Sequence, residues 1–393
     1  MKEKILIVSN YYPPEKGAAA NRIEQLALKL SHNNYEVSVV CPLPNYPDGK
    51  IFKSHRGKFS STEQHDGITV KRLWIYPSNS KNILVRIISI LSFSVGLFFF
   101  LAFQKTPHKV IVQSPPLLLS FISVFVLRLK SKKIILNVSD LWPLAAVELG
   151  AIKTGTLPHR FSLFLERYIY RNATVVLGQS EEIIAHIREK FPDKPCYLYR
   201  NYPDHISAID SPTQSDGKIK LFYAGLLGVA QGVVAMCDKI DLPPGMELHI
   251  FGNGAEKNQL ETLLKLRPEK QIHFHGMLER TELLKRLSDF DVAVVPLKTR
   301  IYGSVPSKIF EYSALGIPIL YFGGGEGNKI VAENNLGWIA EVGDYHELNQ
   351  RLQEIFTIGR PSIHSTRNQL KRHAAANFSL EAQISGLIAK GVF

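Results

Sequence analysis

Strand-like apolar runs alternate with helical stretches along this chain of 393 residues, and this alternation constrains its fold more than any other feature. Parallel strands need a crossover connection, usually a helix, so the alternation predicts parallel sheets. In the first half, strand-like runs occupy 4–9, 36–42, 68–75, 109–113 and 133–138, with helical stretches at 19–32, 83–103 and 117–129. The second half repeats the pattern with strand-like runs at 220–224, 247–251, 272–275, 292–296 and 317–322.

The length of the chain and the repeated pattern predict two α/β domains. A chain of 393 residues exceeds one ordinary core, and its hydrophobic fraction of 45% suffices for two. Residues 202–217, YPDHISAIDSPTQSDG, are polar and rich in Pro, Asp and Ser, which is typical of a linker. We therefore place the first domain at 1–205 and the second at 206–378, with 379–393 as a helix that returns to the first domain.

The positive charge of the chain lies in its first half. Residues 1–201 hold 27 Lys and Arg against 14 Asp and Glu, whereas residues 202–393 hold 20 against 21. The basic half predicts an acidic partner. The sequence lacks the modular signatures and the mixture of arginine and aromatic side chains that nucleic-acid binding usually shows. We therefore predict no nucleic-acid partner and instead an anionic membrane surface.

The segment 83–103, ILVRIISILSFSVGLFFFLAF, supports the membrane interpretation. Its 21 residues include one charge, Arg86, and by length it could span a bilayer. It lies between two strand-like runs of one predicted sheet, however, and a span would put those strands on opposite sides of the membrane. We favour a helix that packs partly on the sheet and lies in the membrane interface. A fully buried core helix and a membrane span are the alternatives.

The expected location is the cytoplasmic face of the plasma membrane, with peripheral attachment. The first nine residues read as a strand and lack the apolar stretch and cleavage site of a leader. The three cysteines, Cys41, Cys196 and Cys237, are scattered and odd in number, which fits free thiols in a reducing compartment.

The segment 302–325, YGSVPSKIFEYSALGIPILYFGGG, predicts a nucleotide-sugar site. It reads as a loop, an amphipathic helix with Lys308 and Glu311, a buried strand and a glycine loop. A loop that leads into a helix N-terminus presents unpaired backbone N–H groups to an anion, and a carboxylate one turn inside can bind a sugar hydroxyl. The alternative is an ordinary solvated helix face.

Six motifs follow one another along nearly the whole chain. They are YYPPEKGAAANRIEQLALKL, SDLWPLAAVELGA, YAGLLGVAQG, FGNGAEKNQL, PSKIFEYSALGIP and GWIAEVGDYHEL. In this order they resemble the retaining glycosyltransferases of the GT-B fold in family four, and within it the bacterial capsule and O-antigen branch, similar to the L-fucosamine transferase group. The resemblance implies two Rossmann-like, doubly wound lobes that face a cleft.

The resemblance also implies the reaction. It indicates transfer of a sugar, most simply of the N-acetylhexosamine type, from a UDP-sugar bound by the second lobe to a polyprenyl-diphosphate-linked acceptor bound by the first. Two other functions stay open at this point. One is a nucleotide-sugar 2-epimerase, which shares the fold but uses no acceptor, and the other is a membrane-bound scaffold with a degenerate donor site.

Two glycine loops are predicted to approach the donor. Gly17 lies after the first strand, where small residues let the backbone approach a phosphate or sugar; a plain strand-to-helix turn is the alternative. Gly225 opens the matching loop of the second lobe. Where the family usually has an Arg and a Lys for the diphosphate, this chain has Leu226 and Gln231, and Gln231 can still donate a hydrogen bond.

A second departure concerns two glutamates that the family spaces eight residues apart. The later one matches Glu311, which by resemblance holds the ribose hydroxyls, whereas the earlier position is Gly303. Glu326 in GGGEGNK is a candidate catalytic residue that replaces the missing carboxylate at the donor sugar, or else a solvated loop acid. Ser307 belongs to the predicted donor site. Lys308, together with Arg300, is the nearest cationic replacement at the diphosphate.

Asp140 in the DLWP run is the principal catalytic candidate. It follows the strand 133–138 at the carboxyl end, where parallel sheets bind ligands. We expect its carboxylate to orient the acceptor hydroxyl or to stabilise positive charge at the sugar carbon; a helix cap is the alternative, and Glu148 is a weaker candidate. A retaining transferase needs no enzyme nucleophile, because the leaving phosphate can accept the acceptor's proton on the same face.

The sequence predicts no metal and no cofactor besides the UDP-sugar substrate. The histidines are dispersed and no Cys/His ligand set is visible. Asp289-Phe290-Asp291 spells a two-acid metal pattern, but it leads into an apolar strand and favours a helix-to-strand turn. Gly252-Asn253-Gly254 lacks the third glycine of a dinucleotide motif.

Overall fold

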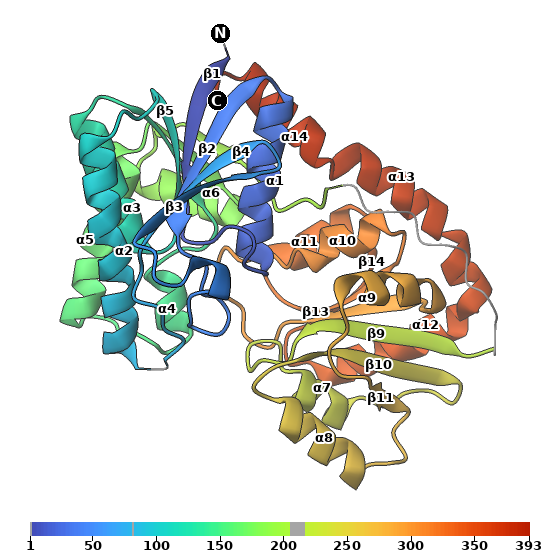
Figure 1. The fold of residues 1–393 in the computed structure, drawn as a ribbon. Coiled ribbons are helices and arrows are strands. Elements are labelled where there is room, and N and C mark those ends of the chain that lie inside the picture. The colour runs from blue at the N-terminus through green and yellow to red at the C-terminus, as the bar shows by residue number, and fades with distance from the viewer. Residues whose placement is uncertain (1, 81, 205–216) are drawn as a thin grey trace. The chain divides into compact units, whose positions relative to one another are not determined.

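The computed structural model describes residues 2–80, 82–204 and 217–393 and is drawn as a ribbon in Figure 1. The chain divides into two compact units. Unit 1 comprises Met1–Asn201 and Glu381–Phe393, and unit 2 comprises Tyr202–Leu380. The predicted domain boundary at 205/206, and the linker prediction for 205–216, fall outside the described residues.

Unit 1 contains an eight-stranded sheet with the order β3-β4-β2-β1-β5-β6-β7-β8. All neighbouring pairs are parallel except β3 and β4, which form an antiparallel pair. The sequence analysis missed β3, because its residues SSTEQH are polar. It is an edge strand with one exposed and one half-buried face. The strands are β1 Glu3–Val8, β2 Tyr35–Pro42, β3 Ser60–His65, β4 Ile68–Leu73, β5 Lys109–Ser114, β6 Lys133–Val138, β7 Val175–Gly178 and β8 Cys196–Leu198.

Helices make the crossover connections between the parallel strands of unit 1. The C-terminal helix α14 belongs to this unit from Glu381 onward. The three cysteines are buried and free, as expected. The helices are α1 Ala18–His32, α2 Ile83–Phe103, α3 Leu117–Leu129, α4 Leu144–Glu148, α5 Leu157–Asn172, α6 Glu181–Lys190 and α14 Leu380–Ala389, with a 3₁₀ turn η1 at Lys53–His55.

Helix α2 packs on unit 1 along one narrow stripe. Phe93, Leu97 and Leu101 follow a four-residue spacing and are fully buried. The rest of the helix is apolar as well. The segment 84–103 has a mean hydropathy of 2.3 and could cross a membrane by length and composition alone. Only 22% of its most apolar window is buried. The alternative of a fully buried core helix is therefore wrong.

The connectivity excludes a simple span within this fold. Helix α2 joins β4 to β5, and both strands belong to the same sheet. Helix α2 packs beside α3, and α3 packs beside α5, as Figure 1 shows. The exposed apolar side chains of these three helices are Leu84, Ile87, Ile88, Leu91, Val95, Phe98, Phe99 and Phe103 on α2, Phe125 and Leu129 on α3, and Leu157, Phe161 and Phe164 on α5.

Unit 2 contains a six-stranded, fully parallel sheet with the order β11-β10-β9-β12-β13-β14. The residues that fill its interior strands are nearly all apolar, which is expected of a parallel sheet covered on both faces. The strands are β9 Ile219–Leu226, β10 Met246–Asn253, β11 Ile272–Phe274, β12 Val292–Pro296, β13 Ile319–Gly323 and β14 Gly337–Glu341.

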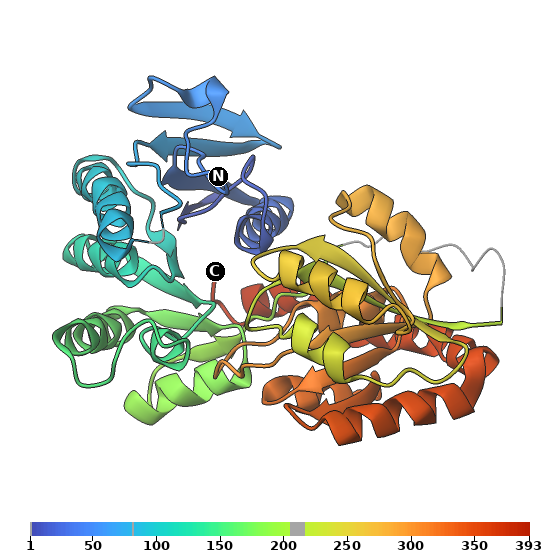
Figure 2. The ribbon, with the colours of Figure 1, turned by 90° about the horizontal axis from the view of Figure 1, so that it is seen from below.

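Two hydrophobic cores lie on the two faces of this sheet. Helices α7, α8 and α12 contribute buried residues to one core, and α10, α11 and α13 contribute to the other. Figure 2 shows the sheet of unit 2 between helices. The helices are α7 Val233–Lys239, α8 Lys257–Leu266, α9 Arg280–Arg286, α10 Lys308–Ala314, α11 Glu326–Glu333, α12 Tyr345–Ser365 and α13 Arg367–Asn377, with a 3₁₀ turn η2 at Leu287–Asp289.

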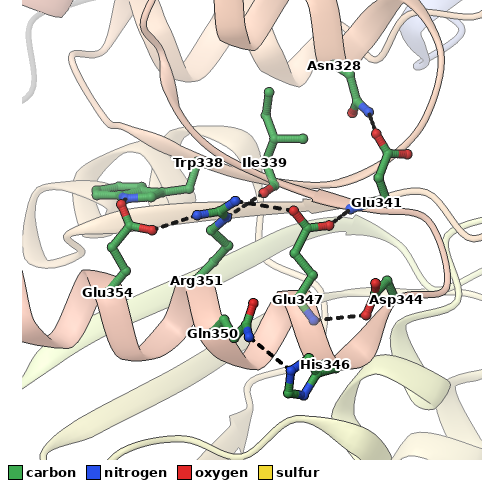
Figure 3. Close-up of polar contacts among 10 residues, drawn as sticks. All are labelled: Asn328, Trp338, Ile339, Glu341, Asp344, His346, Glu347, Gln350, Arg351 and Glu354. Atoms are coloured by element: carbon green, nitrogen blue, oxygen red, sulfur yellow. Dashed lines mark hydrogen bonds and ion pairs between the residues drawn. The ribbon is translucent and has the colours of Figure 1, made fainter.

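The GWIAEVGDYHEL motif forms a polar contact between edge strand β14 and helix α12 (Figure 3). Arg351 donates to the carboxylate of Glu354 and to the carbonyl oxygen of Ile339, both at 2.9 Å. Glu347 accepts a 2.7 Å hydrogen bond from the backbone N–H of Glu341. The bonds to Ile339 and Glu341 attach strand β14 to the helix that follows it, so this motif has a structural explanation.

Candidate functional site

The strand order of unit 2 places its candidate site at the carboxyl ends of β9, β12 and β13. The chain runs from β9 outward to β10 and β11, then crosses to β12 on the other side of β9. Ligands of open α/β sheets bind where the strand order reverses in this way. The predicted donor residues of unit 2 lie at the end of β9, in the loops at this edge and on the helices α10 and α11 that follow them: Gly225, Gln231, Gly303, Ser307, Lys308, Glu311 and Glu326.

Glu311 lies on α10 between two cations. Its carboxylate accepts from Lys308 Nζ at 3.1 Å and forms an ion pair with Arg280 Nη2 at 3.0 Å. The Glu311 side chain is 14% exposed, so most of this carboxylate is shielded from water. Lys308 also lies over the ring of Tyr312, with 5.3 Å from Nζ to the ring centroid. Glu311 is therefore not a residue of an ordinary solvated helix face.

Gly303 occupies the position of the missing first glutamate, and its backbone explains why glutamate is absent. Its φ of 85° lies in the region that favours glycine, so a side chain here would strain the turn. Gly303 is buried. Ser307 follows at the N-cap of α10, where its carbonyl oxygen accepts from the N–H groups of Phe310 and Glu311 at 3.1 Å.

The end of β9 and the loop after it contain the second group of donor candidates. Gly225 pairs with Gly252 of β10. A Cβ atom on Gly252 would lie 1.9 Å from the carbonyl oxygen of Gly225, so Gly252 can only be glycine where the two strands approach each other this closely. Gln231 Oε1 is buried and has no hydrogen-bond partner among the described residues. Leu226 is 62% exposed. The end of β9 and its loop thus present an exposed apolar side chain and a buried amide at the positions where the resemblance implies two cations.

Glu326 begins helix α11 after the glycine loop that ends β13. It is 5% exposed, so it is not a solvated loop acid. A Cβ on Gly325, whose φ is 77°, would lie 2.9 Å from Arg300 Nε. The Arg300 guanidinium therefore lies directly against this loop, beside the position of Glu326, which makes Arg300 a basic side chain at the donor edge of unit 2.

Gly17 and its neighbours line a pocket in unit 1. The pocket has a volume of 170 Å³ and is lined by the loop between β1 and α1, which includes Tyr11, by the first residues of α1 and by Tyr46. Gly17 is the N-cap residue of α1. Glu15 is 3% exposed and accepts from the backbone N–H groups of Asn45 and Tyr46 at 2.8 and 2.9 Å. Burial raises the pKa of Glu15. The hydrogen bonds lower this pKa, but by less than burial raises it.

Arg22, on the first turns of α1, organises the carboxyl ends of β6, β7 and β8. It is 5% exposed and donates to Asn137 Oδ1 at 2.8 Å, to Gln179 Oε1 and to the carbonyl oxygen of Tyr199 at 3.4 Å. Its Nε has no hydrogen-bond partner among the described residues. Sequence reasoning missed Arg22, because a single arginine within a helix carries no signal of its burial.

Asp140 lies two residues beyond β6 and close to this arginine. Burial raises the pKa of Asp140 to about 6, although the Arg22 charge and a hydrogen bond with Ser139 lower it. Helix α4 begins at Leu144 with Pro143 as its N-cap, so Asp140 is not a helix cap. Glu148 ends α4 and is exposed. The fold therefore holds a partly desolvated carboxylate at a strand end, where a reactive group is expected.

The Asp289-Phe290-Asp291 sequence has a structural role, as predicted. Asp289 ends the 3₁₀ turn η2 and is exposed, whereas Asp291 is fully buried just before β12. Asp291 accepts from the N–H of Lys220 at 2.7 Å and pairs with Arg360 at 2.9 Å. Because one carboxylate is committed to the core and the other faces solvent, the two do not form a metal pair.

The comparisons with known proteins match both units to glycosyltransferase domains. Residues 17–198 match the model described as glycosyl transferase 4-like domain, and residues 209–376 match the model of glycosyl transferases group 1. The chain is 25% identical over 267 residues to the probable glycosyltransferase WbjE of Pseudomonas aeruginosa. That match covers 63% of this chain and 66% of WbjE. This chain therefore spans slightly less than two thirds of the length of WbjE.

The fold is similar to that of solved glycosyltransferase structures. Sucrose-phosphate synthase from Thermosynechococcus elongatus matches with a TM-score of 0.73 and 16% identity, with 99% of each chain covered. HepE from Anabaena, in complex with UDP and glucose, matches with a TM-score of 0.65 and 14% identity, over 99% of this chain and 100% of HepE. At these identities the likeness establishes the fold.

Proposed function

The chain is a glycosyltransferase of the GT-B fold, and from this premise we propose that it transfers a sugar from a UDP-sugar to a polyprenyl-diphosphate-linked acceptor with retention of configuration. The sugar is of the N-acetylhexosamine type, and the product serves bacterial surface polysaccharide synthesis. Unit 2 binds the donor and unit 1 binds the acceptor. The resemblance in six ordered motifs and the complex of HepE with UDP and glucose support this assignment.

The observation that carries the donor proposal is the position of Glu311 at the strand-order reversal of unit 2. A carboxylate that is 14% exposed and held by Lys308 and Arg280 is oriented before any ligand arrives. Ribose hydroxyls can donate to it, and the two cations can compensate negative charge on the diphosphate. Preorganised groups of this kind contribute affinity because little side-chain freedom is lost on binding.

The proposed chemistry uses no metal and no enzyme nucleophile. The leaving diphosphate accepts the proton of the attacking hydroxyl on the face it departs from, so configuration is retained. Arg300 and the side-chain amide N–H of Gln231 donate to the phosphates in place of the usual cations. Asp140, whose pKa of about 6 leaves it mostly ionised at pH 7.5, orients the acceptor hydroxyl or stabilises positive charge at the sugar carbon. Glu326 contacts the donor sugar.

The lipid-linked acceptor requires access to a membrane, and the exposed apolar helices of unit 1 support peripheral attachment. Phe99 and Phe103 of α2 are 55% and 76% exposed and stack with ring centroids 6.1 Å apart. Lys130, at the end of α3, binds the carbonyl oxygens of Leu101 and Ala102 at the C-terminus of α2. An apolar face bordered by basic residues suits insertion into the interface of an anionic membrane. The protein thus acts at the cytoplasmic face of the plasma membrane.

One experiment separates the proposed transferase from its alternatives. The purified protein is incubated with a panel of radiolabelled UDP-sugars, with and without a polyprenyl-diphosphate-linked sugar. We expect transfer of label that depends on the acceptor. Isomerisation without acceptor would instead identify a 2-epimerase, and a protein that neither binds nor converts any donor would be a scaffold. Glu311→Gln should abolish most transfer, whereas Glu333→Gln, an exposed glutamate on α11, is the matched control.

A further inference from the structure

Four polar side chains gather on one face of the β10–β11 edge of unit 2, and none of them belongs to the predicted donor site. In the parallel pairing of these strands, His249 lies opposite His273. Glu247 precedes His249 by two residues, and His275 follows His273 by two. Because residues two apart share a face of a strand, the pairing brings all four side chains to the same side. Figure 1 shows β11 beside β10.

The ligand atoms of three of these residues are close enough for one ion. One atom each from Glu247, His249 and His273 lies within 4.8 Å of the other two. His249 Nε2 is 3.4 Å from Glu247 Oε2, and His273 Nε2 is 4.0 Å from Glu247 Oε1. Ligands bonded at about 2.1 Å to a tetrahedral zinc ion are roughly 3.4 Å apart. The exposed His273 side chain, 45% accessible, can move by the small remaining distance.

From this geometry we propose that Glu247, His249 and His273 form a binding site for a divalent transition-metal cation, with Zn²⁺ as its natural occupant. Two imidazole nitrogens and one carboxylate oxygen are a known zinc donor set, and the fourth coordination position is left to water. The site links the three-residue edge strand β11 to β10.

His275 supports the site without being a ligand. Its Nε2 lies 2.9 Å from His249 Nδ1, and its ring stacks on Phe251 with centroids 4.6 Å apart. When His249 Nδ1 donates to His275, the lone pair of Nε2 points toward Glu247. Such a partner fixes the tautomer and orientation of a metal-binding histidine. Lys218 pairs with Glu247 Oε1 and is the competitor that the metal must displace.

The test measures zinc binding and thermal stability of the full chain, without a histidine tag and after treatment with a chelator. Zinc sulfate is titrated in a competition assay with a chromophoric chelator, and melting is followed by circular dichroism. We expect one zinc ion per chain and a melting temperature that rises with zinc. His273→Asn should weaken zinc affinity at least tenfold and abolish the rise. Lys218→Ala, which frees Glu247, should strengthen affinity.

His346→Asn is the matched control, because His346 is exposed on α12 and lies outside the cluster. Since His273 is exposed, its replacement should leave the fold intact, and the circular dichroism spectrum without zinc checks this. Failure of the unaltered chain to bind zinc at micromolar concentration would overturn the proposal. So would equal losses in His273→Asn and His346→Asn, which would indicate binding by scattered surface histidines.

Discussion

Replacement of Asp140 by Asn should make the protein more stable and less active. The folded state raises the pKa of Asp140 from 3.8 to about 6, chiefly through burial. The folded protein therefore holds this proton more tightly than the unfolded chain does, and the free energy of unfolding falls as pH rises between these two values. Because one pKa unit corresponds to about 1.4 kcal/mol, the ionised carboxylate destabilises the fold by about 3 kcal/mol above pH 7.

The asparagine variant lacks this ionisation, so its gain in stability should grow with pH. Linkage predicts a gain of about 1 kcal/mol at pH 4.5 and about 3 kcal/mol at pH 8. The attraction between Asp140 and Arg22 lowers the pKa of Asp140, and the values above already include this effect. Urea unfolding at a series of pH values measures the gain, and Glu148→Gln, at an exposed glutamate on α4, is the matched control.

Activity provides the second half of this prediction. If the charge of Asp140 faces a developing positive carbon, turnover should fall about a hundredfold while UDP affinity is retained. A variant that is less stable at every pH would refute the desolvation argument. A variant that gains stability but keeps near-normal turnover would remove Asp140 from the reaction and direct attention to Glu326.

Three further outcomes test the donor and membrane assignments. Glu311→Gln should weaken uridine binding about tenfold or more, since a charge-assisted hydrogen bond to ribose contributes about 1.5–3 kcal/mol, and calorimetry showing unchanged uridine affinity would contradict the assignment. Lys308→Ala should weaken UDP far more than uridine, because only UDP carries charge; equal losses would mean that Lys308 supports the fold. Serine at three exposed α2 positions, Phe98, Phe99 and Phe103, should abolish sedimentation with anionic liposomes while leaving UDP binding and melting temperature unchanged; loss of the fold would show that the aromatic run is core.

The membrane variant uses Phe103 because the structure distinguishes the four phenylalanines in this part of α2. Phe98, Phe99 and Phe103 are exposed, whereas Phe100 is half-buried and lines a pocket with residues of β1, β2 and β4. Leu266, 72% exposed on α8 of unit 2, is the matched control for replacing an exposed apolar side chain by serine. An equal effect of Leu266→Ser on liposome binding would show that the apolar face of α2 is not specific.

The prediction from sequence succeeded where apolar runs report burial directly. The segments 133–138, 292–296, 83–103 and 117–129 have the predicted bounds, because a strand covered on both faces and an apolar helix differ from their surroundings in composition. It failed at β3, whose residues are polar, and it also missed the short strands β7, β8 and β14, which have three to five residues each. An antiparallel edge strand has no such contrast, and only pairing with β4 reveals it.

The sequence by itself determined the α/β class, the parallel sheets and the motifs that identify a glycosyltransferase, since these depend on local periodicity and on short runs of residues. The tertiary structure alone decided which charges meet. The ion pair of Arg280 with Glu311, the approach of Arg22 to Asp140 and the pairing of His249 with His273 join residues on separate helices or strands. Strand order and register set such contacts, and no local pattern in the sequence records them.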